Sequence, residues 1–187
     1  MNSKGVSKVV GLTIICFTLL FALAADSFAV SKAEIDVGVN ASLERFDNQV
    51  KGAKEFRGVA KGMLVIPNVT KAAFIIGGQY GQGALKEGGQ TVGYYSLAAG
   101  SLGYQIGAEK FDLVIIFATD EALAKFKNSE GWEVGVNAEV TLIDTGMDVP
   151  ASTLLSQHPV VGFVFGQKGL MAGVSIKGAK FTKINPE

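Results

Sequence analysis

Residues 76–107 read IGGQYGQGALKEGGQTVGYYSLAAGSLGYQIG and are the most informative part of the chain for the fold. Ten glycines in this stretch lie among apolar and aromatic residues that are typical of β-strands. Glycine inside a strand marks a bulge, a sharp bend or a place where another backbone approaches closely. Strongly curved sheets need such positions. The stretch therefore predicts a curved, barrel-like sheet.

The same glycines do not match a phosphate-binding loop. The order Gly78-Gln79-Tyr80-Gly81-Gln82-Gly83 is the dinucleotide fingerprint reversed, and no Lys-Ser or Lys-Thr follows a glycine as a P-loop requires. The flanking segments are expected strands, so no helix N-terminus is expected beside the loop to receive a phosphate. We expect neither a nucleotide nor another cofactor.

The composition of the whole chain excludes several other classes. The 187 residues carry 17 Lys+Arg and 17 Asp+Glu, so the basic excess of a nucleic-acid-binding protein is absent. One Cys and one His cannot form a zinc site of several Cys and His ligands, nor an intramolecular disulfide. Twenty-four glycines are roughly twice the usual share of about 7%.

The first 29 residues resemble a secretory signal peptide. Lys4 and Lys8 precede an uncharged apolar run over residues 9–25, and small residues end the segment at Ala29. We expect cleavage after Ala29, with Ala24 as the second choice; an uncleaved N-terminal anchor is the alternative. The remaining chain, residues 30–187, has no Cys and a formal charge near −1. We therefore expect an exported protein, periplasmic or secreted, that is stabilised by its core or a closed sheet.

From residue 30 to about residue 58, apolar residues recur at steps of three and four. They are Ile35, Val39, Leu43, Phe46, Val50 and Ala53. This period predicts one long helix with an apolar stripe. Ser31 and Glu34 fit a capping box at its start. The opposite face carries mixed charges, so we expect the helix to pack on its own domain rather than on a membrane.

Shorter apolar and β-branched runs follow and predict strands. They cover residues 63–66, ended by Pro67-Asn68 as a turn, then 72–78 with an extension to 85, 90–97, 102–108, 112–118, 132–143, 160–167, 170–176 and 180–184. Thr119 caps a second helix through Phe126, residues 144–150 form a loop, and Lys168-Gly169 and Lys177-Gly178 form hairpin turns. The pattern predicts a single α+β domain, in which an N-terminal helix packs on a curved, mainly antiparallel, Gly-rich, barrel-like sheet with a second short helix.

The sequence does not contain a catalytic constellation. His158 is the only imidazole, and the segment Gly100-Ser101-Leu102-Gly103 has Ala99 where a nucleophile elbow needs its first glycine. The paired carboxylates are helix-cap or surface-like neighbours, and no EF-hand spacing is present. We expect no enzyme and no metal site.

Several linked motifs resemble the SYLF domain, also called the Ysc84 actin-binding or DUF500 domain. The stretch AKGMLVIPNVTKA at 60–72, followed by GGQYGQG at 77–83, is similar to the opening of that domain. SLGYQIGA at 101–108 resembles its central segment, and KGLMAGVS at 168–175 matches in order and spacing. The resemblance covers roughly residues 33–185 and is closest to bacterial, exported, single-domain members.

The resemblance implies a non-enzymatic lipid-binding module of the cell envelope or secreted space, with a phospholipid or an anionic membrane surface as partner. Eukaryotic members bind phosphoinositides and membranes, and a yeast-type member binds actin. The helix of this chain lacks a basic face, which argues against actin-type binding and phosphoinositide specificity here. A structural or protein-interaction module of the envelope, with an unknown protein partner, is the alternative.

Two sets of side chains are candidates for lipid contact. Lysines at expected strand ends and turns could attract anionic headgroups, each contributing about 1 kcal/mol near a charged surface; they are Lys61, Lys71, Lys86, Lys110, Lys168, Lys177 and Lys180. Aromatic residues could occupy the boundary layer of the lipid; they are Tyr80, Tyr94, Tyr95 and Tyr104. The alternative for the lysines is that they keep the sheet edges soluble.

Overall fold

A computed structural model describes residues 30–73, 76–102, 107–168 and 175–187. The expected signal peptide therefore lies outside the described residues. Within them, the helices are α2 (Lys32–Gln49), α3 (Ala53–Val59), α4 (Asp120–Lys127) and α5 (Ala151–Gln157). The strands are β1 (Gly62–Ala73), β2 (Ile76–Glu87), β3 (Gln90–Leu102), β4 (Gly107–Phe117), β5 (Trp132–Glu133), β6 (Thr141–Ile143), β7 (Val160–Lys168) and β8 (Lys180–Ile184).

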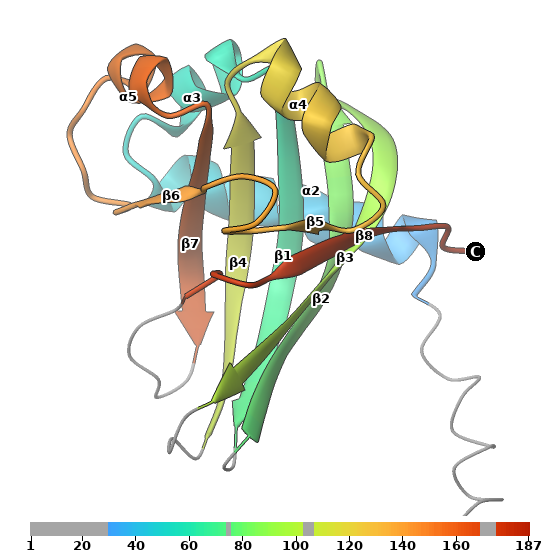
Figure 1. Ribbon diagram of the computed structural model, residues 1–187. Helices are drawn as coiled ribbons and strands as arrows, with labels where there is room; N and C mark the ends of the chain where they lie inside the picture. The colour runs from blue at the N-terminus through green and yellow to red at the C-terminus, as the bar shows by residue number, and fades with distance from the viewer. Residues whose placement is uncertain (1–29, 74–75, 103–106, 169–174) are drawn as a thin grey trace, which may run out of the picture. The chain divides into compact units, whose positions relative to one another are not determined.

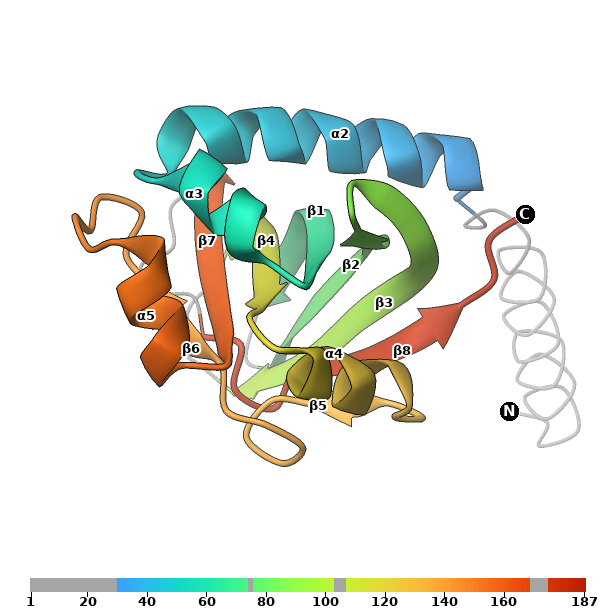
Figure 2. The same cartoon turned by 90° about the horizontal axis from the view of Figure 1, so that it is seen from above.

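The strands of the unit Lys32–Asn185 form one sheet in the order β5-β8-β3-β2-β1-β4-β7-β6. All neighbouring pairs are antiparallel except β6 and β7, which are parallel. Seen from above, the sheet curls from β7 through β1 to β8, and α2 lies along its outer side (Figure 2). The α+β class, the N-terminal helix and the curved, mainly antiparallel sheet are confirmed.

Two hydrophobic clusters cover the two faces of the sheet. On the outer face, α2, α3 and α5 pack on side chains such as Val65, Val114 and Phe163. On the inner face, α4 and the segments around β5 and β8 pack on side chains such as Leu64 and Phe117. Figure 1 shows α4 and β8 crossing in front of the long strands while α2 lies behind them.

The apolar stripe of the first helix is buried as predicted, but the helix is interrupted. Ile35, Val39 and Phe46 are all core residues. Gly52 has φ +75°, a left-handed conformation that an α-helix does not continue through. The predicted single helix over residues 30–58 is therefore wrong, and two helices, α2 and α3, replace it.

Pro67 and Asn68 do not end the first strand, contrary to the prediction from the sequence. Strand β1 continues to Ala73 through an irregularity at which its register shifts against both neighbours. Asn68 has φ +49°, and its N–H is directed to the side chain of Asp112 rather than to the sheet. A bulge of this kind bends a strand without ending it.

Other boundaries also differ from the predictions. Of the expected strand over residues 102–108, Leu102 ends β3 and Gly107 begins β4, and residues 103–106 lie outside the described residues. Only the two ends of the expected strand 132–143 are strands, and α5 follows the predicted loop 144–150 unforeseen. Lys177-Gly178 form a turn, with φ +74° at Gly178. The Lys168-Gly169 turn and most of the expected strand 170–176 lie outside the described residues.

The glycines act as predicted where β2 crosses the β1 bulge. A Cβ on Gly83 would lie 1.9 Å from the backbone oxygen of Val65, and one on Gly81 would lie 2.7 Å from the Ile66 side chain. Only glycine permits this approach of two backbones. Gly88 and Gly89, both with positive φ, form the two-residue turn between β2 and β3. We call the end of the sheet with this turn the hairpin end.

Candidate functional site

The candidate lysines do not gather on one rim. Lys61 and Lys86 lie at the hairpin end of the sheet, beside the start of β1 and near the end of β2. Lys71 and Lys110 lie toward the opposite end, where Lys110 pairs in register with Thr70 on one side and Lys168 on the other. Lys177 and Lys180 lie near β8, with their side chains beside Gly135 and Gly131. Strand register thus separates the set into three places.

The candidate tyrosines have different environments. Tyr80 is exposed on the outer face, whereas Tyr95 is only 4% exposed and packs on Phe126 with ring centroids 4.7 Å apart. Tyr94 is half-buried and donates its hydroxyl proton to Asp36 Oδ2 at 2.9 Å. Tyr104 lies outside the described residues. Of the three described rings, Tyr80 is the exposed one.

A recess at the hairpin end brings together two cations from separate elements. It has a volume of about 240 Å³ and its walls come from α2, α3, the start of β1 and the Gly88–Gly89 turn. Arg57 from α3 and Lys86 from β2 are its charged lining residues. We call it the basic recess. Lys61, with a half-exposed side chain, adjoins the lining residues Ala60 and Gly62.

Neighbouring groups orient both cations. Lys86 Nζ lies 3.3 Å from both the Gly89 oxygen and Thr91 Oγ1, so its ammonium group is held over the glycine turn. Arg57 pairs with Asp47 on α2, which neutralises part of its charge. Thr91 in turn donates to Asp36 at 3.0 Å. The recess therefore presents a lysine ammonium, an arginine edge and glycine backbone to one small volume.

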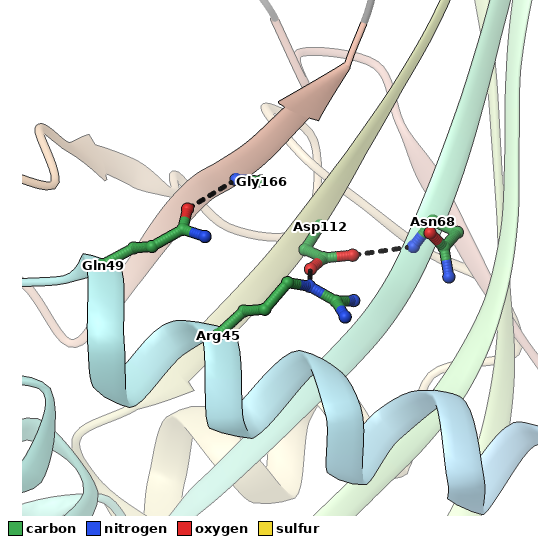
Figure 3. Close-up of polar contacts among 5 residues, drawn as sticks. All are labelled: Arg45, Gln49, Asn68, Asp112 and Gly166. Atoms are coloured by element: carbon green, nitrogen blue, oxygen red, sulfur yellow. Dashed lines mark hydrogen bonds and ion pairs between the residues drawn. The ribbon is translucent and has the colours of Figure 1, made fainter.

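An ion pair between a buried carboxylate and a half-buried guanidinium joins α2 to the outer face of the sheet (Figure 3). Arg45 Nε on α2 donates to Asp112 Oδ2 on β4 at 2.6 Å, and Asp112 Oδ1 accepts the Asn68 backbone N–H at 2.9 Å. The Asp112 side chain is 3% exposed and that of Arg45 is 35% exposed. The hydrogen bond to Asp112 raises the pKa of Arg45, although burial opposes the rise. One carboxylate thus joins the helix, β4 and the β1 bulge.

Sequence reasoning missed this contact. Asp112 was expected to begin a strand, whereas it lies inside one, between buried Phe111 and Leu113. A charged residue within an apolar strand was the available signal, since a buried carboxylate needs a partner. Gly166 supports the pair: its φ is +64°, and a Cβ at this position would lie 3.2 Å from Asp112 Oδ2, which leaves little room for a side chain. Its N–H donates to Gln49 on α2 at 3.1 Å.

Comparison with known proteins matches the second half of the chain to one family. Residues 98–186, from β3 to just beyond β8, match the model described as "Ysc84: Las17-binding protein actin regulator". This part of the chain is a Ysc84 (SYLF) domain. The resemblance carried by the sequence motifs is thereby confirmed.

Three relatives show the extent of the likeness. Protein YSC84 of Saccharomyces cerevisiae is 32% identical over 127 residues, and LAS seventeen-binding protein 3 of the same yeast is 31% identical over 127 residues. The human SH3 domain-containing YSC84-like protein 1 is 30% identical over 128 residues. Each match covers 64% of this chain but only 27% to 36% of the relative. The Ysc84 chain thus matches about a third or less of the length of these proteins.

A second cavity of this Ysc84 domain contains its only histidine. It has a volume of about 350 Å³ and lies between α4, β5 and the start of β7; its lining includes Glu121, Trp132, Glu139 and His158. His158 Nδ1 lies 3.1 Å from Thr141 Oγ1, and Glu121 pairs with Lys125 at 2.8 Å. In the described ranges, no three His, Cys, Asp or Glu side chains are grouped so as to hold a metal ion. The family description names binding and regulation, not a reaction.

Among the helices of the described ranges, none combines the length and the apolar character that crossing a bilayer requires.

Proposed function

We propose that this Ysc84 domain binds phospholipid surfaces without catalysing a reaction, through anionic headgroups that enter the basic recess. The observation that supports this is the convergence of Lys86 and Arg57 on one small volume beside a glycine turn. Arginine and lysine are the side chains that bind phosphate most strongly. The proposal narrows the seven candidate lysines to Lys86, with Lys61 next to it.

The rest of the candidate set has a secondary role in this proposal. Lys110, which is exposed, and Tyr80, on the outer face, could contact the same surface only if the domain lay on it along its length. Lys177 and Lys180 lie beside the loop at Gly131 and Gly135, away from the recess in the sheet order. Headgroup binding by the recess therefore does not require them.

Vesicle co-sedimentation of the full chain tests the proposal. We expect binding to vesicles containing phosphatidylglycerol to exceed binding to pure phosphatidylcholine, and to weaken at high salt. Lys86→Gln and Arg57→Gln should each weaken binding about fivefold, because each charge near an anionic surface contributes about 1 kcal/mol. Lys183→Gln, an exposed change of the same charge on β8, is the matched control. Equal losses in all three variants would show that only net charge matters and would contradict a recess.

We also propose that the protein lies outside the cytoplasm, as an exported, periplasmic or secreted protein peripheral to a membrane. The basic and apolar start of the sequence supports this, since it has the order of a signal peptide. Mass spectrometry of the protein isolated from its native host tests it. A mature N-terminus at Val30 is the expected result, and an intact N-terminus in a cytoplasmic fraction would contradict it.

Protein binding is the second candidate function. The family model is described as a Las17-binding protein and actin regulator, and one yeast relative is named LAS seventeen-binding protein 3. For this chain we rank it below lipid binding because the exposed face of α2 mixes charges of both signs and offers no single patch. Co-sedimentation with actin filaments separates the two candidates: pelleting with filaments but not with anionic vesicles would reverse the ranking.

A further inference from the structure

The cavity around His158 has the features of a binding site, and the proposed function does not use it. Its volume of about 350 Å³ falls within the range of about 300–1,000 Å³ that is common for small-molecule sites. Parts of the chain that are far apart in sequence line it, namely α4, β5, the loop before β6 and the start of β7. The apolar lining residues are Ala122, Trp132, Ala138, Pro159 and Val160. We call it the histidine cavity.

The charged lining of the histidine cavity contains two carboxylates and one ammonium group, so one negative charge is in excess. Glu121 pairs with Lys125 Nζ at 2.8 Å, one turn further along α4. Glu139 makes no hydrogen bond or ion pair with any of the described residues. All three side chains are exposed, so the cavity is open to solvent on the side where they lie. A ligand can therefore reach Glu139 without a rearrangement of the fold.

His158 offers a second polar atom to the cavity. Its Nδ1 lies 3.1 Å from Thr141 Oγ1 on β6, which orients the half-buried ring. When Nδ1 carries the proton and donates to Thr141, Nε2 is a hydrogen-bond acceptor. A ligand that donates an N–H would favour this tautomer. Two acceptors, one of them charged, then belong to the same lining.

Hydrogen bonds fix the loop that carries Glu139. Asn137 Oδ1 accepts the Glu133 N–H at 2.7 Å, and the Asn137 N–H donates to the Glu133 oxygen at 2.9 Å. The Gly135 N–H donates to the Ala138 oxygen at 2.9 Å. A wall that is already ordered loses little conformational freedom when a ligand binds. The cavity is thus formed before any ligand enters.

We propose that the histidine cavity binds an aliphatic primary ammonium group, whose N–H groups donate to Glu139 and His158 while its methylene stem lies on the apolar lining. The unpaired carboxylate favours a cation and disfavours an anion. The three ligands that a metal ion needs are not grouped in the described part of the chain. A primary ammonium supplies three N–H donors together with the charge.

This ligand chemistry has two sources, a lysine side chain of a protein partner and a free alkylamine. Neither depends on the proposed lipid binding, because the histidine cavity and the basic recess have no lining residue in common. The experiment therefore measures amine binding in the absence of lipid and then compares the two sources.

Fluorescence titration of the full chain at pH 7 tests the proposal, because Trp132 is the only tryptophan and lines the cavity. We expect n-butylamine, a cation at this pH, to change the emission in a saturable way. n-Butanol, which is neutral, and tetramethylammonium, a cation without an N–H, should each bind about tenfold more weakly or less, the effect of one hydrogen bond to a charged group. Equal affinity for butylamine and butanol would overturn the proposal.

Variants assign the effect to the cavity. Glu139→Gln should weaken butylamine binding about tenfold. Glu130→Gln, an exposed change of the same charge outside the lining, should keep the affinity within about twofold. Lys86→Gln, which tests the basic recess, should leave amine binding unchanged, so the two proposals can fail separately. Unchanged affinity in Glu139→Gln would refute the assignment to this cavity.

A peptide comparison distinguishes the two sources. The peptide acetyl-Gly-Lys-Gly-amide is titrated beside the same peptide with an acetylated lysine Nζ. Binding of the unmodified peptide alone assigns the cavity to a lysine of a protein partner, whereas binding of butylamine but of neither peptide assigns it to a free amine; both results support the ammonium site. Equal binding of the two peptides contradicts it. So does butylamine that changes neither the Trp132 emission nor the melting temperature.

Discussion

Replacing Asp112 by Asn should destabilise the domain by about 2 kcal/mol. Asparagine keeps an oxygen for the Asn68 N–H, which lies 2.9 Å from the carboxylate, but removes the charge that Arg45 Nε contacts at 2.6 Å. A hydrogen bond to a charged group contributes about 1.5–3 kcal/mol. We expect the lower part of that range because Arg45 is 35% exposed and water can solvate its guanidinium.

Replacing Arg45 by Gln should cost more, about 3 kcal/mol. Of the two donors to the Asp112 carboxylate described above, this change keeps only the backbone N–H of Asn68, and the carboxylate is 3% exposed. Breaking a buried pair from one side costs about 3–5 kcal/mol. The double variant should also lose about 3 kcal/mol rather than the sum, since the two residues act as one pair.

Urea unfolding at pH 7 measures these free energies through the fluorescence of Trp132, the only tryptophan, which is buried against Phe126. Asp148→Asn is the matched control, since Asp148 also contacts a cation, Lys51, at 2.6 Å but is 81% exposed. Exposed pairs contribute about 0–1 kcal/mol. The ion pair does not hold α2 if Asp112→Asn costs no more unfolding free energy than Asp148→Asn. The same conclusion follows if the losses of the two single variants add up in the double variant.

Three further changes test other parts of the fold. Gly83→Ala should cost about 3 kcal/mol or prevent folding, because its Cβ would lie 1.9 Å from the Val65 oxygen, whereas Gly100→Ala, with nothing within 4 Å, should stay within about 0.5 kcal/mol in the same urea assay. Burial raises the pKa of Tyr94 and Tyr95, with the Asp36 hydrogen bond adding to the rise at Tyr94. The folded state then holds these protons more tightly, so stability should be full below about pH 10 and fall as pH rises above it; absorbance of the tyrosinate band should lose one late transition in each of Tyr94→Phe and Tyr95→Phe. Thr119 accepts the Ala122 N–H at the start of α4 at 3.2 Å. Thr119→Ala should therefore reduce the free energy of unfolding by about 1 kcal/mol and lower the melting temperature, whereas Thr119→Ser should leave both unchanged.

Local periodicity explains why much of the fold was predictable. The stripe from Ile35 to Phe46 follows the helical repeat, and the run before α4 is apolar and branched as buried strands are. The close approaches at Gly81 and Gly83 were also expected from glycine inside strands. These features depend on neighbours within a few residues, which a single sequence displays directly.

The missed features depend on contacts between distant residues. Asn68 continues β1 past Pro67 because Asp112, 44 residues away, accepts its N–H. Arg45 reaches the same carboxylate across 67 residues. The place of each lysine follows from strand register, which buries Lys71 on the inner face of the sheet and leaves Lys110 exposed. No local pattern contains that information.

The Arg45–Asp112 pair also permits a test of whether stability and headgroup binding are separable in this domain. Arg45 lies between Leu43, which lines the basic recess, and Asp47, which pairs with the recess residue Arg57. Ile35, Val39 and Phe46 hold the same helix by burial alone, so α2 should keep its position after the charge is lost. In conditions where Asp112→Asn remains folded, we therefore expect its affinity for anionic vesicles to stay within about twofold of the unmodified chain, while its unfolding free energy falls by about 2 kcal/mol. An affinity that falls as far as in Lys86→Gln would mean that the buried pair positions the recess itself, and that α2 transmits changes on the sheet to the lipid.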